Sequence, residues 1–288
     1  MVERSTIDLG RAYLARSLWQ WTLFFRGMAF GSFIACLALF AGCVGPQTAP
    51  SMDRQAIIDR IVSSTAKIMI EKDGHRISSG SGVVVASKPG GPNLQAVSYV
   101  LTAAHVVDEA NNAQVIVRFT GAYATQGRFV ATVSCRGNPD TLDLAVLKVP
   151  GIAVPPAIIP MEEDEIRLGE EILLIGFPWG KRLGLFSGIV SQIPTNGEEK
   201  SPADEGTDPS IVVDAASAKG VSGGGVFRGA TGTLIGVVEG YQTASVSVKD
   251  KASTYSINVP MPGETFVVPI SRIRHFLQES GLSERLAE

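Results

Sequence analysis

Short hydrophobic runs rich in β-branched residues dominate the chain after residue 65. Gly, Pro, Asn and Asp separate these runs, and such punctuation is typical of β-strands joined by turns. The runs do not alternate with helical patterns, which argues against a parallel α/β sheet. The pattern predicts an all-β barrel or sandwich, with strands over residues 66–71, 81–87, 97–103, 113–119, 128–134, 143–149, 171–177, 186–193, 210–216, 232–240 and 265–270.

An amphipathic helix is predicted at each end of this β-rich region. Ser51 is the expected N-cap of the first helix, and Ser271 that of the second, which Gly281 should end. Each helix has one apolar face that should pack on the strands: Ile57, Ile58, Ile61 and Val62 in the first, and Ile273, Phe276 and Leu277 in the second.

The N-terminus has a different character. Residues 1–26 carry several arginines against Glu3 and Asp8, and no charged residue lies between Gly27 and Cys43. A basic leader, a short apolar core and small residues at the exit are typical of a secretory signal peptide. The apolar stretch is just shorter than the ~20 residues that a membrane-spanning helix needs. We therefore expect a signal peptide over residues 1–42, a linker over residues 43–52 and a folded domain over residues 53–288.

The end of the apolar stretch, Phe40-Ala41-Gly42-Cys43, resembles the lipobox of bacterial lipoproteins. That resemblance implies cleavage before Cys43 and lipidation of this cysteine, and several acyl chains would anchor the chain firmly in a membrane. An uncleaved membrane anchor and cleavage at another position are the alternatives. We expect the folded domain to face the periplasm in the bacterial cell envelope, attached to a membrane.

Bulk composition narrows the possible functions. The 288 residues are 45% hydrophobic and carry a formal net charge of −3, which gives no reason to expect a nucleic-acid partner. Of the three cysteines, only Cys135 lies in the folded domain, so no intramolecular disulfide is expected there. Cys135 has no neighbouring metal ligands in the sequence, and we expect neither a metal nor another cofactor.

The segment Gly220–Val226 places Ser222 among four glycines. Taken alone, such a cluster is more often a simple turn between strands. A serine hydroxyl becomes a nucleophile when a histidine acts as its base and a carboxylate orients that histidine. The function of Ser222 therefore depends on whether the chain offers both partners.

One of the three histidines suits this role. His75 lies in a turn and His275 on the outer face of the predicted C-terminal helix, whereas His105 ends a hydrophobic strand. Asp143 begins an apolar strand, where a carboxylate is costly to bury unless it is hydrogen-bonded. Asp108 and Asp140 are nearby alternatives, but both lie in polar, turn-like contexts. His105, Asp143 and Ser222 are the predicted catalytic residues.

Gly220–Gly224 also matches the G-x-S-x-G motif of α/β-hydrolases. In that fold the nucleophile comes first, followed by the acid and the histidine, which would select Ser222, Asp250 and His275 here. The fold also needs helices after parallel strands, which the hydrophobic pattern does not provide. The order His105, Asp143, Ser222 is instead that of chymotrypsin.

The segments TAAHVV, DLAVLKV and DAASAKGVSGGGV resemble the catalytic segments of trypsin-like serine proteases, and in particular the protease domain of the bacterial HtrA family. GSGVVV, LGEEILLIGFPWG and SGIVSQI extend the resemblance. It implies a chymotrypsin-like double β-barrel that hydrolyses peptide bonds of polypeptide substrates through an acyl-enzyme. It also implies an oxyanion hole made by the N–H groups of Gly220 and Ser222, with Gly223 contributing in some geometries. Since the sequence ends at Glu288, we expect no PDZ domain.

The resemblance also suggests a specificity pocket. Ala216, six residues before the serine, should form its floor, and the strand around Val238 and Tyr241 one wall. Without an acidic residue at the floor, we expect cleavage after small or medium apolar residues rather than after Lys or Arg. The alternative function is a binding or chaperone-like module that keeps the protease fold and cleaves little.

Overall fold

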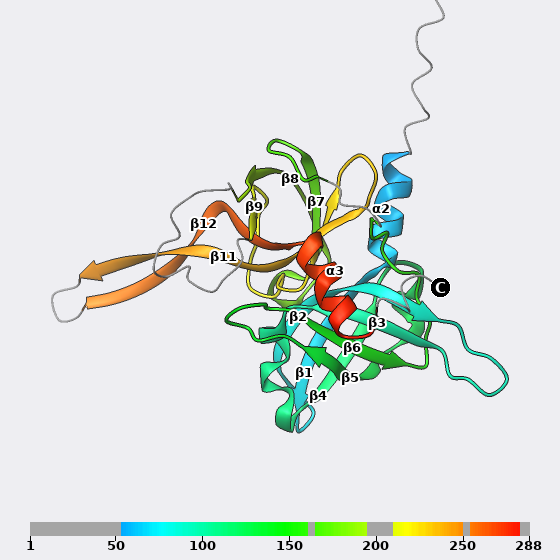
Figure 1. Ribbon diagram of the computed structural model, residues 1–288. Coiled ribbons are helices and arrows are strands. Elements are labelled where there is room, and N and C mark those ends of the chain that lie inside the picture. Colours follow the sequence, from blue (N-terminus) through cyan, green and yellow to red (C-terminus); the bar gives the residue numbers. More distant parts are fainter. Residues whose placement is uncertain (1–52, 161–164, 195–209, 250–253, 283–288) are drawn as a thin grey trace, which may run out of the picture. The chain divides into compact units, whose positions relative to one another are not determined.

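The computed structural model describes residues 53–160, 165–194, 210–249 and 254–282. Their strands close into two six-stranded barrels, with the neighbour orders β1-β2-β3-β6-β5-β4 and β10-β11-β12-β9-β8-β7 (Figure 1). All these named strands pair antiparallel, so the predicted all-β class and double barrel are confirmed. The predicted signal peptide, the linker and Cys43 lie outside the described residues.

The first barrel follows from alternating apolar residues that fill its interior. Its core includes Ile68, Val84, Val100, Val117 and Leu147. Two 3-10 segments, η1 (Ala104–Asn112) and η2 (Gly121–Gln126), connect its strands. The strands are β1 (Thr65–Lys72), β2 (His75–Lys88), β3 (Val97–Thr102), β4 (Gln114–Phe119), β5 (Phe129–Arg136) and β6 (Ala145–Pro150).

The second barrel has its own core, which includes Leu174, Val190, Val213, Val226 and Val267. The turn between its first two strands contains η3 (Pro178–Gly180). The strands are β7 (Glu171–Gly176), β8 (Gly184–Gln192), β9 (Ile211–Val213), β10 (Gly225–Arg228), β11 (Leu234–Lys249) and β12 (Thr254–Pro269). The short β10 was not among the predicted strands, because it follows the glycine cluster without a hydrophobic run of its own.

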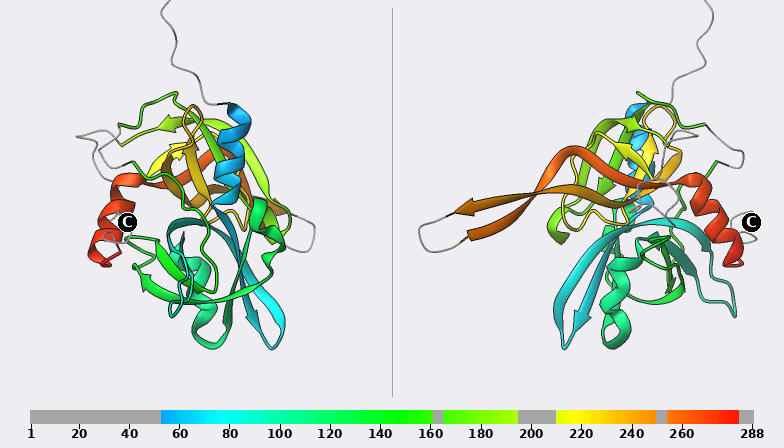
Figure 2. Two further views of the ribbon diagram at one scale, coloured as in Figure 1. Left: turned by 90° about the vertical axis from the view of Figure 1, so that its right-hand side faces the viewer. Right: turned by 60° about the vertical axis from the view of Figure 1, so that its left-hand side comes forward.

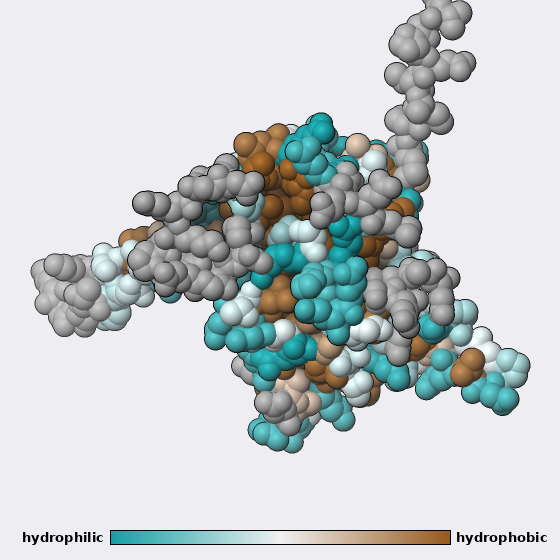
Figure 3. Space-filling view, in the orientation of Figure 1, coloured by the Kyte–Doolittle hydropathy of each residue, from teal (hydrophilic) through white to brown (hydrophobic). Residues whose placement is uncertain are grey.

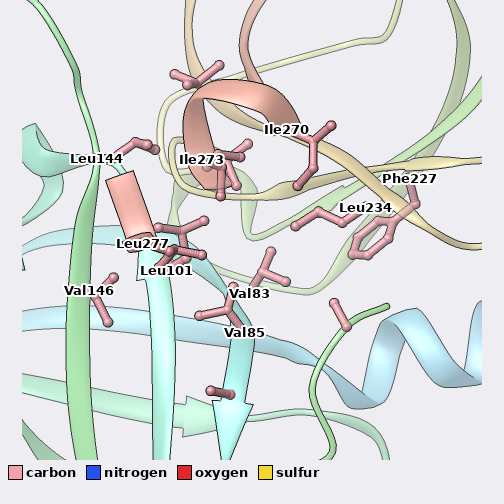
Figure 4. Packing of buried hydrophobic residues seen from close by; sticks show 14 of the residues in the cluster. Val83, Val85, Leu101, Leu144, Val146, Phe227, Leu234, Ile270, Ile273 and Leu277 are labelled. Carbon is pink, nitrogen blue, oxygen red and sulfur yellow. The ribbon is translucent and has the colours of Figure 1, made fainter. Parts of the chain in front are cut away.

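A third hydrophobic cluster joins the two barrels. It contains Val83 and Leu101 from the first barrel and Phe227 and Leu234 from the second (Figure 4). Both helices contribute to this cluster, α2 through Ile57 and Ile61 and α3 through residues such as Ile273 and Leu277. Burying one such side chain contributes roughly 1.5–3 kcal/mol. The cluster therefore holds the barrels together and sets the geometry where they meet.

Both predicted helices form, but with different N-caps. Helix α2 (Arg54–Ser63) is capped by Asp53, whose carboxylate accepts from the Gln55 N–H at 3.2 Å. The predicted cap Ser51 was therefore wrong, because a stronger acceptor follows it directly before the helix. Helix α3 (Ile270–Glu279) begins straight after β12, so Ser271 lies inside it, and no side chain caps its N-terminus.

Helix α3 otherwise behaves as predicted. Gly281, at φ +65°, ends it, and Ile273, Phe276 and Leu277 are buried. Figure 3 shows that the outward face of the helix is mainly hydrophilic. Neither α2 nor α3, the helices of the described part of the chain, is long and apolar enough to cross a membrane.

Strands β11 and β12 are much longer than predicted. Beyond the barrel they pair only with each other, from Thr243↔Pro260 to Lys249↔Thr254, and this hairpin projects from the body (Figures 1 and 2). One face carries partly exposed apolar side chains such as Val246, Ile257 and Val259, and Ser245 and Asn258 lie on the other. The period-2 alternation that stabilises the hairpin continues beyond the predicted ends of both strands.

Candidate active site

His105 and Asp143 are brought together by strand pairing in the first barrel. The end of β3 pairs with the start of β6, with Thr102 opposite Ala145. His105 lies in η1, three residues after the end of β3, and Asp143 lies two residues before β6, so both lie at the same edge of the sheet. Asp143 is 5% exposed, as expected for a carboxylate that is hydrogen-bonded within the protein.

Both carboxylate oxygens of Asp143 contact His105. One accepts from the His105 backbone N–H at 2.8 Å, and the other lies 2.5 Å from the ring Nδ1. Because a carboxylate oxygen accepts, this contact places the ring proton on Nδ1 and leaves Nε2 free to take a proton. The His105 side chain is 42% exposed and therefore open to a substrate.

The alternative acids occupy other environments. Asp108 forms an ion pair with Arg136, and Asp140 is exposed in a turn where its N–H contacts Asn138. His75 lies at the exposed start of β2, while His275 is 70% exposed on α3 and pairs with Glu279 at 3.2 Å. Of these described residues, only His105 and Asp143 form an imidazole–carboxylate pair at the barrel edge.

Ser222 lies in two consecutive tight turns of the second barrel. The Val221 N–H donates to the Ala218 carbonyl at 3.0 Å, and the Gly224 N–H donates to the Val221 carbonyl at 2.7 Å. The third residue of each turn has a positive φ, +94° at Gly220 and +81° at Gly223, which is the geometry that favours glycine. The fully buried Val221 side chain anchors the segment in the barrel core.

The turns leave two N–H groups open. The Lys219 carbonyl accepts from the Trp179 N–H at 2.6 Å. In a trans peptide the carbonyl and the following N–H point in opposite directions, so the Gly220 N–H is directed away from Trp179. The same reasoning applies to the Val221–Ser222 peptide. Its carbonyl accepts from the Gly224 N–H inside the turn, so the Ser222 N–H points away from the inside of the turn. The Gly223 N–H donates to the Val238 carbonyl at 2.8 Å and is not available to a substrate.

The Ser222 segment packs against the strands that lead to His105. A Cβ on Gly223 would lie 3.0 Å from the Ala103 nitrogen, two residues before His105. The Ser81 N–H donates to the Ser222 carbonyl at 2.9 Å. No hydrogen bond joins the side chains of Ser222 and His105, both of them described residues. Such bonds are often loose in apo structures and tighten with substrate.

The predicted pocket residues occupy different environments. Ala216 is exposed, whereas Val238 is 1% exposed in the barrel core, and its N–H and carbonyl bond to Gly224 and Gly223, so Val238 is not accessible to a substrate. Tyr241 is partly exposed. The buried Ser217 hydroxyl, next to Ala216 in the chain, has no hydrogen-bond partner among the described residues, and no pattern in the sequence had pointed to it. The groups of His, Cys, Asp and Glu in the described residues include none that could hold a metal ion.

Two antiparallel barrels, with an imidazole–carboxylate pair on one and a serine in glycine turns on the other, have the architecture of double-barrel serine peptidases. Residues 80–237 match the trypsin-like peptidase domain. The chain belongs to this family.

The relatives extend this assignment. Over 160 residues the chain is 31% identical to a "Probable periplasmic serine endoprotease DegP-like" of Pseudomonas putida, covering 56% of this chain and 28% of the relative. Over 224 residues it is 27% identical to human "Serine protease HTRA4", covering 78% and 40%. The chain thus spans less than half the length of these relatives. The HtrA resemblance of the sequence is confirmed.

A solved structure is similar in fold. The crystal structure of the serine endoprotease from Yersinia pestis aligns with a TM-score of 0.56 and 20% identity. The alignment covers 83% of this chain and 70% of that one. At this identity the likeness supports the fold, and the chemistry has to be argued from the residues of this chain.

Proposed function

We propose that this protein is a serine endopeptidase that hydrolyses peptide bonds in unfolded or exposed polypeptides. The observation that carries the proposal is the double contact of Asp143 with His105, at 2.8 and 2.5 Å. A carboxylate held in this way orients the imidazole and stabilises it once protonated. The open N–H groups of Gly220 and Ser222 support the proposal from the second barrel.

In the proposed reaction, the Ser222 Oγ attacks the scissile carbonyl carbon while the His105 Nε2 takes the hydroxyl proton. The carbonyl oxygen becomes an oxyanion that the Gly220 and Ser222 N–H groups bind, and one such donor typically contributes about 3–4 kcal/mol. The C–N bond then breaks, and His105 returns the proton to the leaving amine. A water molecule repeats the sequence on the acyl-enzyme, which releases the acid and restores Ser222.

For specificity, we propose a pocket with Ala216 at its floor and β11 along one wall, where Tyr241 contributes a side chain and the buried Val238 supports the strand from behind. Because no acidic side chain stands at the floor, a small or medium apolar residue should precede the scissile bond. Profiling with a peptide library tests this directly. A strong preference for Lys or Arg at that position would contradict it.

For location, we propose a domain attached through lipidated Cys43 to a membrane and facing the periplasm. The sequence motif at Cys43 supports this, as does the word periplasmic in the names of bacterial relatives. Labelling of cells with a radioactive fatty acid should mark the wild type and not Cys43→Ser. Equal labelling of both would contradict lipidation at this cysteine and favour one of the alternatives.

The decisive experiment uses the full chain in detergent with a fluorophosphonate probe and denatured casein. We expect the probe to label the wild type and casein to be degraded, with both results abolished in Ser222→Ala. If the wild type is neither labelled nor active but suppresses aggregation of casein, the binding module is the better description. Equal labelling of Ser222→Ala would contradict Ser222 as the nucleophile.

A further inference from the structure

Ser81 is a buried residue of the first barrel that forms hydrogen bonds to the nucleophile turn, which we define as residues 218–224. It lies on β2 and is 0% exposed. Its N–H donates to the Ser222 carbonyl at 2.9 Å, and its own carbonyl accepts from the Thr102 hydroxyl at 2.7 Å. Its hydroxyl donates to the Gly220 carbonyl at 2.8 Å and accepts from the Phe177 N–H at 2.9 Å. Every polar group of this residue is therefore used.

These bonds complete a pattern along the nucleophile turn. The four consecutive carbonyls from Lys219 to Ser222 are all hydrogen-bonded, and Ser81 binds two of them. The others are bound by the N–H groups of Trp179 and Gly224. Since the peptide plane is rigid, fixing each carbonyl also fixes the direction of the next N–H. The bonds to the Lys219 and Val221 carbonyls therefore orient the Gly220 and Ser222 N–H groups, and Ser81 holds the two peptides that alternate with these, Gly220–Val221 and Ser222–Gly223.

The bond to the Gly220 carbonyl matters most. Gly220 has a positive φ, and a Cβ there would lie 2.7 Å from the Phe177 carbonyl oxygen. The Ser81 hydroxyl bridges these same two segments, one peptide of the nucleophile turn and the Phe177 N–H of the turn that contains η3. Without the bridge, the Gly220 carbonyl and the Phe177 N–H would both be buried without a partner, and each could regain one only by rotating its peptide.

We propose that Ser81 is a positioning residue of the oxyanion hole, because its hydroxyl holds the Gly220–Val221 peptide in the orientation that aims the neighbouring N–H groups at a substrate. The inference rests on the proposed function. It predicts an effect on the transition state rather than on substrate binding, since Ser81 itself is out of reach of the substrate. Little space remains for a larger side chain, because a Cβ on Gly176 would lie 2.9 Å from the Ser81 Oγ.

Ser98 provides a matched control. It is also 0% exposed in the first barrel, and its hydroxyl likewise bridges one carbonyl and one N–H, those of Ile152 and Val154, at 2.9 and 3.0 Å. These contacts are with the chain after β6 and do not involve the nucleophile turn. Ser81→Ala and Ser98→Ala should therefore lose similar amounts of thermal stability, while only one of them alters the oxyanion hole.

The experiment measures kcat and KM of the full chain for a short fluorogenic peptide, per fluorophosphonate-labelled site and well below the Tm of each variant. For Ser81→Ala we expect kcat to fall about 10- to 100-fold, which is less than the 10²–10³ loss of a complete oxyanion donor, with KM within threefold. A peptide boronate, which forms a tetrahedral adduct on the serine, should bind more weakly by a similar factor. Ser98→Ala should keep the wild-type kcat and boronate affinity.

Equal losses in the two variants would reduce Ser81 to a structural residue and overturn the proposal, as would a wild-type kcat in Ser81→Ala. If Ser81→Ala does not fold, Ser81→Cys replaces it, because a thiol is the closest substitute for the hydroxyl in size and shape and donates weakly. It should show an intermediate loss of kcat, and an unchanged kcat would overturn the proposal. A wild type that neither hydrolyses the peptide nor takes up the fluorophosphonate would instead refute the proposed function itself.

Discussion

The two barrels contribute to the candidate active site in opposite ways. The first supplies side chains, His105 and Asp143, which the pairing of β3 with β6 brings to one edge. Besides the Ser222 hydroxyl, the second supplies backbone, a turn in which Gly220 and Gly223 adopt positive φ and the N–H groups of Gly220 and Ser222 remain open. The contribution of the first barrel depends on which side chains are present. The backbone contribution of the second barrel depends on the absence of side chains at Gly220 and Gly223.

This difference separates two kinds of sensitivity to mutation. An isosteric change at Asp143 should leave the backbone in place and alter only the chemistry. Any added atom at Gly223 should move the backbone, because a Cβ there would lie 2.2 Å from the Ser81 carbonyl oxygen. Variants of His105 and Asp143 therefore test proton transfer, whereas variants of Gly220 and Gly223 test geometry.

The largest effect is expected for Asp143→Asn. The amide can still accept from the His105 N–H, but its NH₂ group would face Nδ1 and favour the wrong ring tautomer. In trypsin-like triads this change lowers kcat by about 10⁴-fold, and we expect a similar loss here with the Tm little changed. Asp140→Asn, in an exposed turn, is the control and should retain full kcat. Comparable kcat values in the two variants would contradict the assigned role of Asp143.

The next effect tests the second barrel through two glycines with similar φ. Gly223 has φ +81° and Gly169 has φ +78°, so alanine costs a similar backbone strain of about 1–2 kcal/mol at either position. Only at Gly223 would the Cβ also meet backbone and side-chain atoms, since nothing lies within 4 Å at Gly169. We expect kcat to fall by at least about 10²-fold in Gly223→Ala and by less than twofold in Gly169→Ala.

The measurement is the kcat of each alanine variant for a short peptide, together with its Tm. If Gly223→Ala retained most of its activity, the nucleophile turn would have to be more adaptable than its contacts with Ser81 and Thr102 indicate.

The pairing of His105 with Asp143 could be predicted from the sequence because each residue adjoins a strong strand pattern. A hydrophobic run ends just before His105 and another begins at Asp143, which singled out both residues, whereas the pairing of β3 with β6 that places them at one edge is seen only in the structure. The glycine content around Ser222 likewise indicated a tight turn. These are local signals, and the structure brings the first two residues into contact.

The features that could not be predicted depend on contacts distant in sequence. Ser81 looked like an ordinary polar position of a strand, and its bonds to Gly220 and Phe177 appear only when the barrels are packed together. The left-handed conformation of Trp179, at φ +56°, could not be predicted from the sequence either, because a bulky residue rarely adopts it without support from its surroundings.

A smaller effect is expected where a side chain of the first barrel supports the backbone of the second. Arg76 donates from Nη1 to the Gly180 carbonyl at 2.9 Å, beside the Trp179 N–H that holds Lys219. Arg76→Gln should lower kcat by about threefold to tenfold through a looser turn, in keeping with one hydrogen bond from a charged group. Arg128→Gln, which loses an ion pair with Glu71, is the control and should not change kcat.

Arg76→Gln should also change the pKa of a neighbouring lysine. Burial lowers the pKa of Lys67, and the positive charges of Arg76 and Arg118 lower it further. Removing the charge of Arg76 should therefore raise the pKa of Lys67 toward its ordinary value, which NMR titration of the lysine side chain can follow. An unchanged pKa of Lys67 in Arg76→Gln would contradict the placement of the Arg76 guanidinium near this lysine.

The smallest effect is expected for His275→Ala. In the order of the α/β-hydrolases this histidine would be the catalytic base, yet it is 70% exposed on α3 and pairs with Glu279. An exposed substitution of this kind usually changes stability by less than about 0.5 kcal/mol, and kcat should stay within twofold of the wild type. A collapse of kcat comparable to that of Asp143→Asn would mean that the base comes from the C-terminal helix, and the first barrel would lose its role in proton transfer.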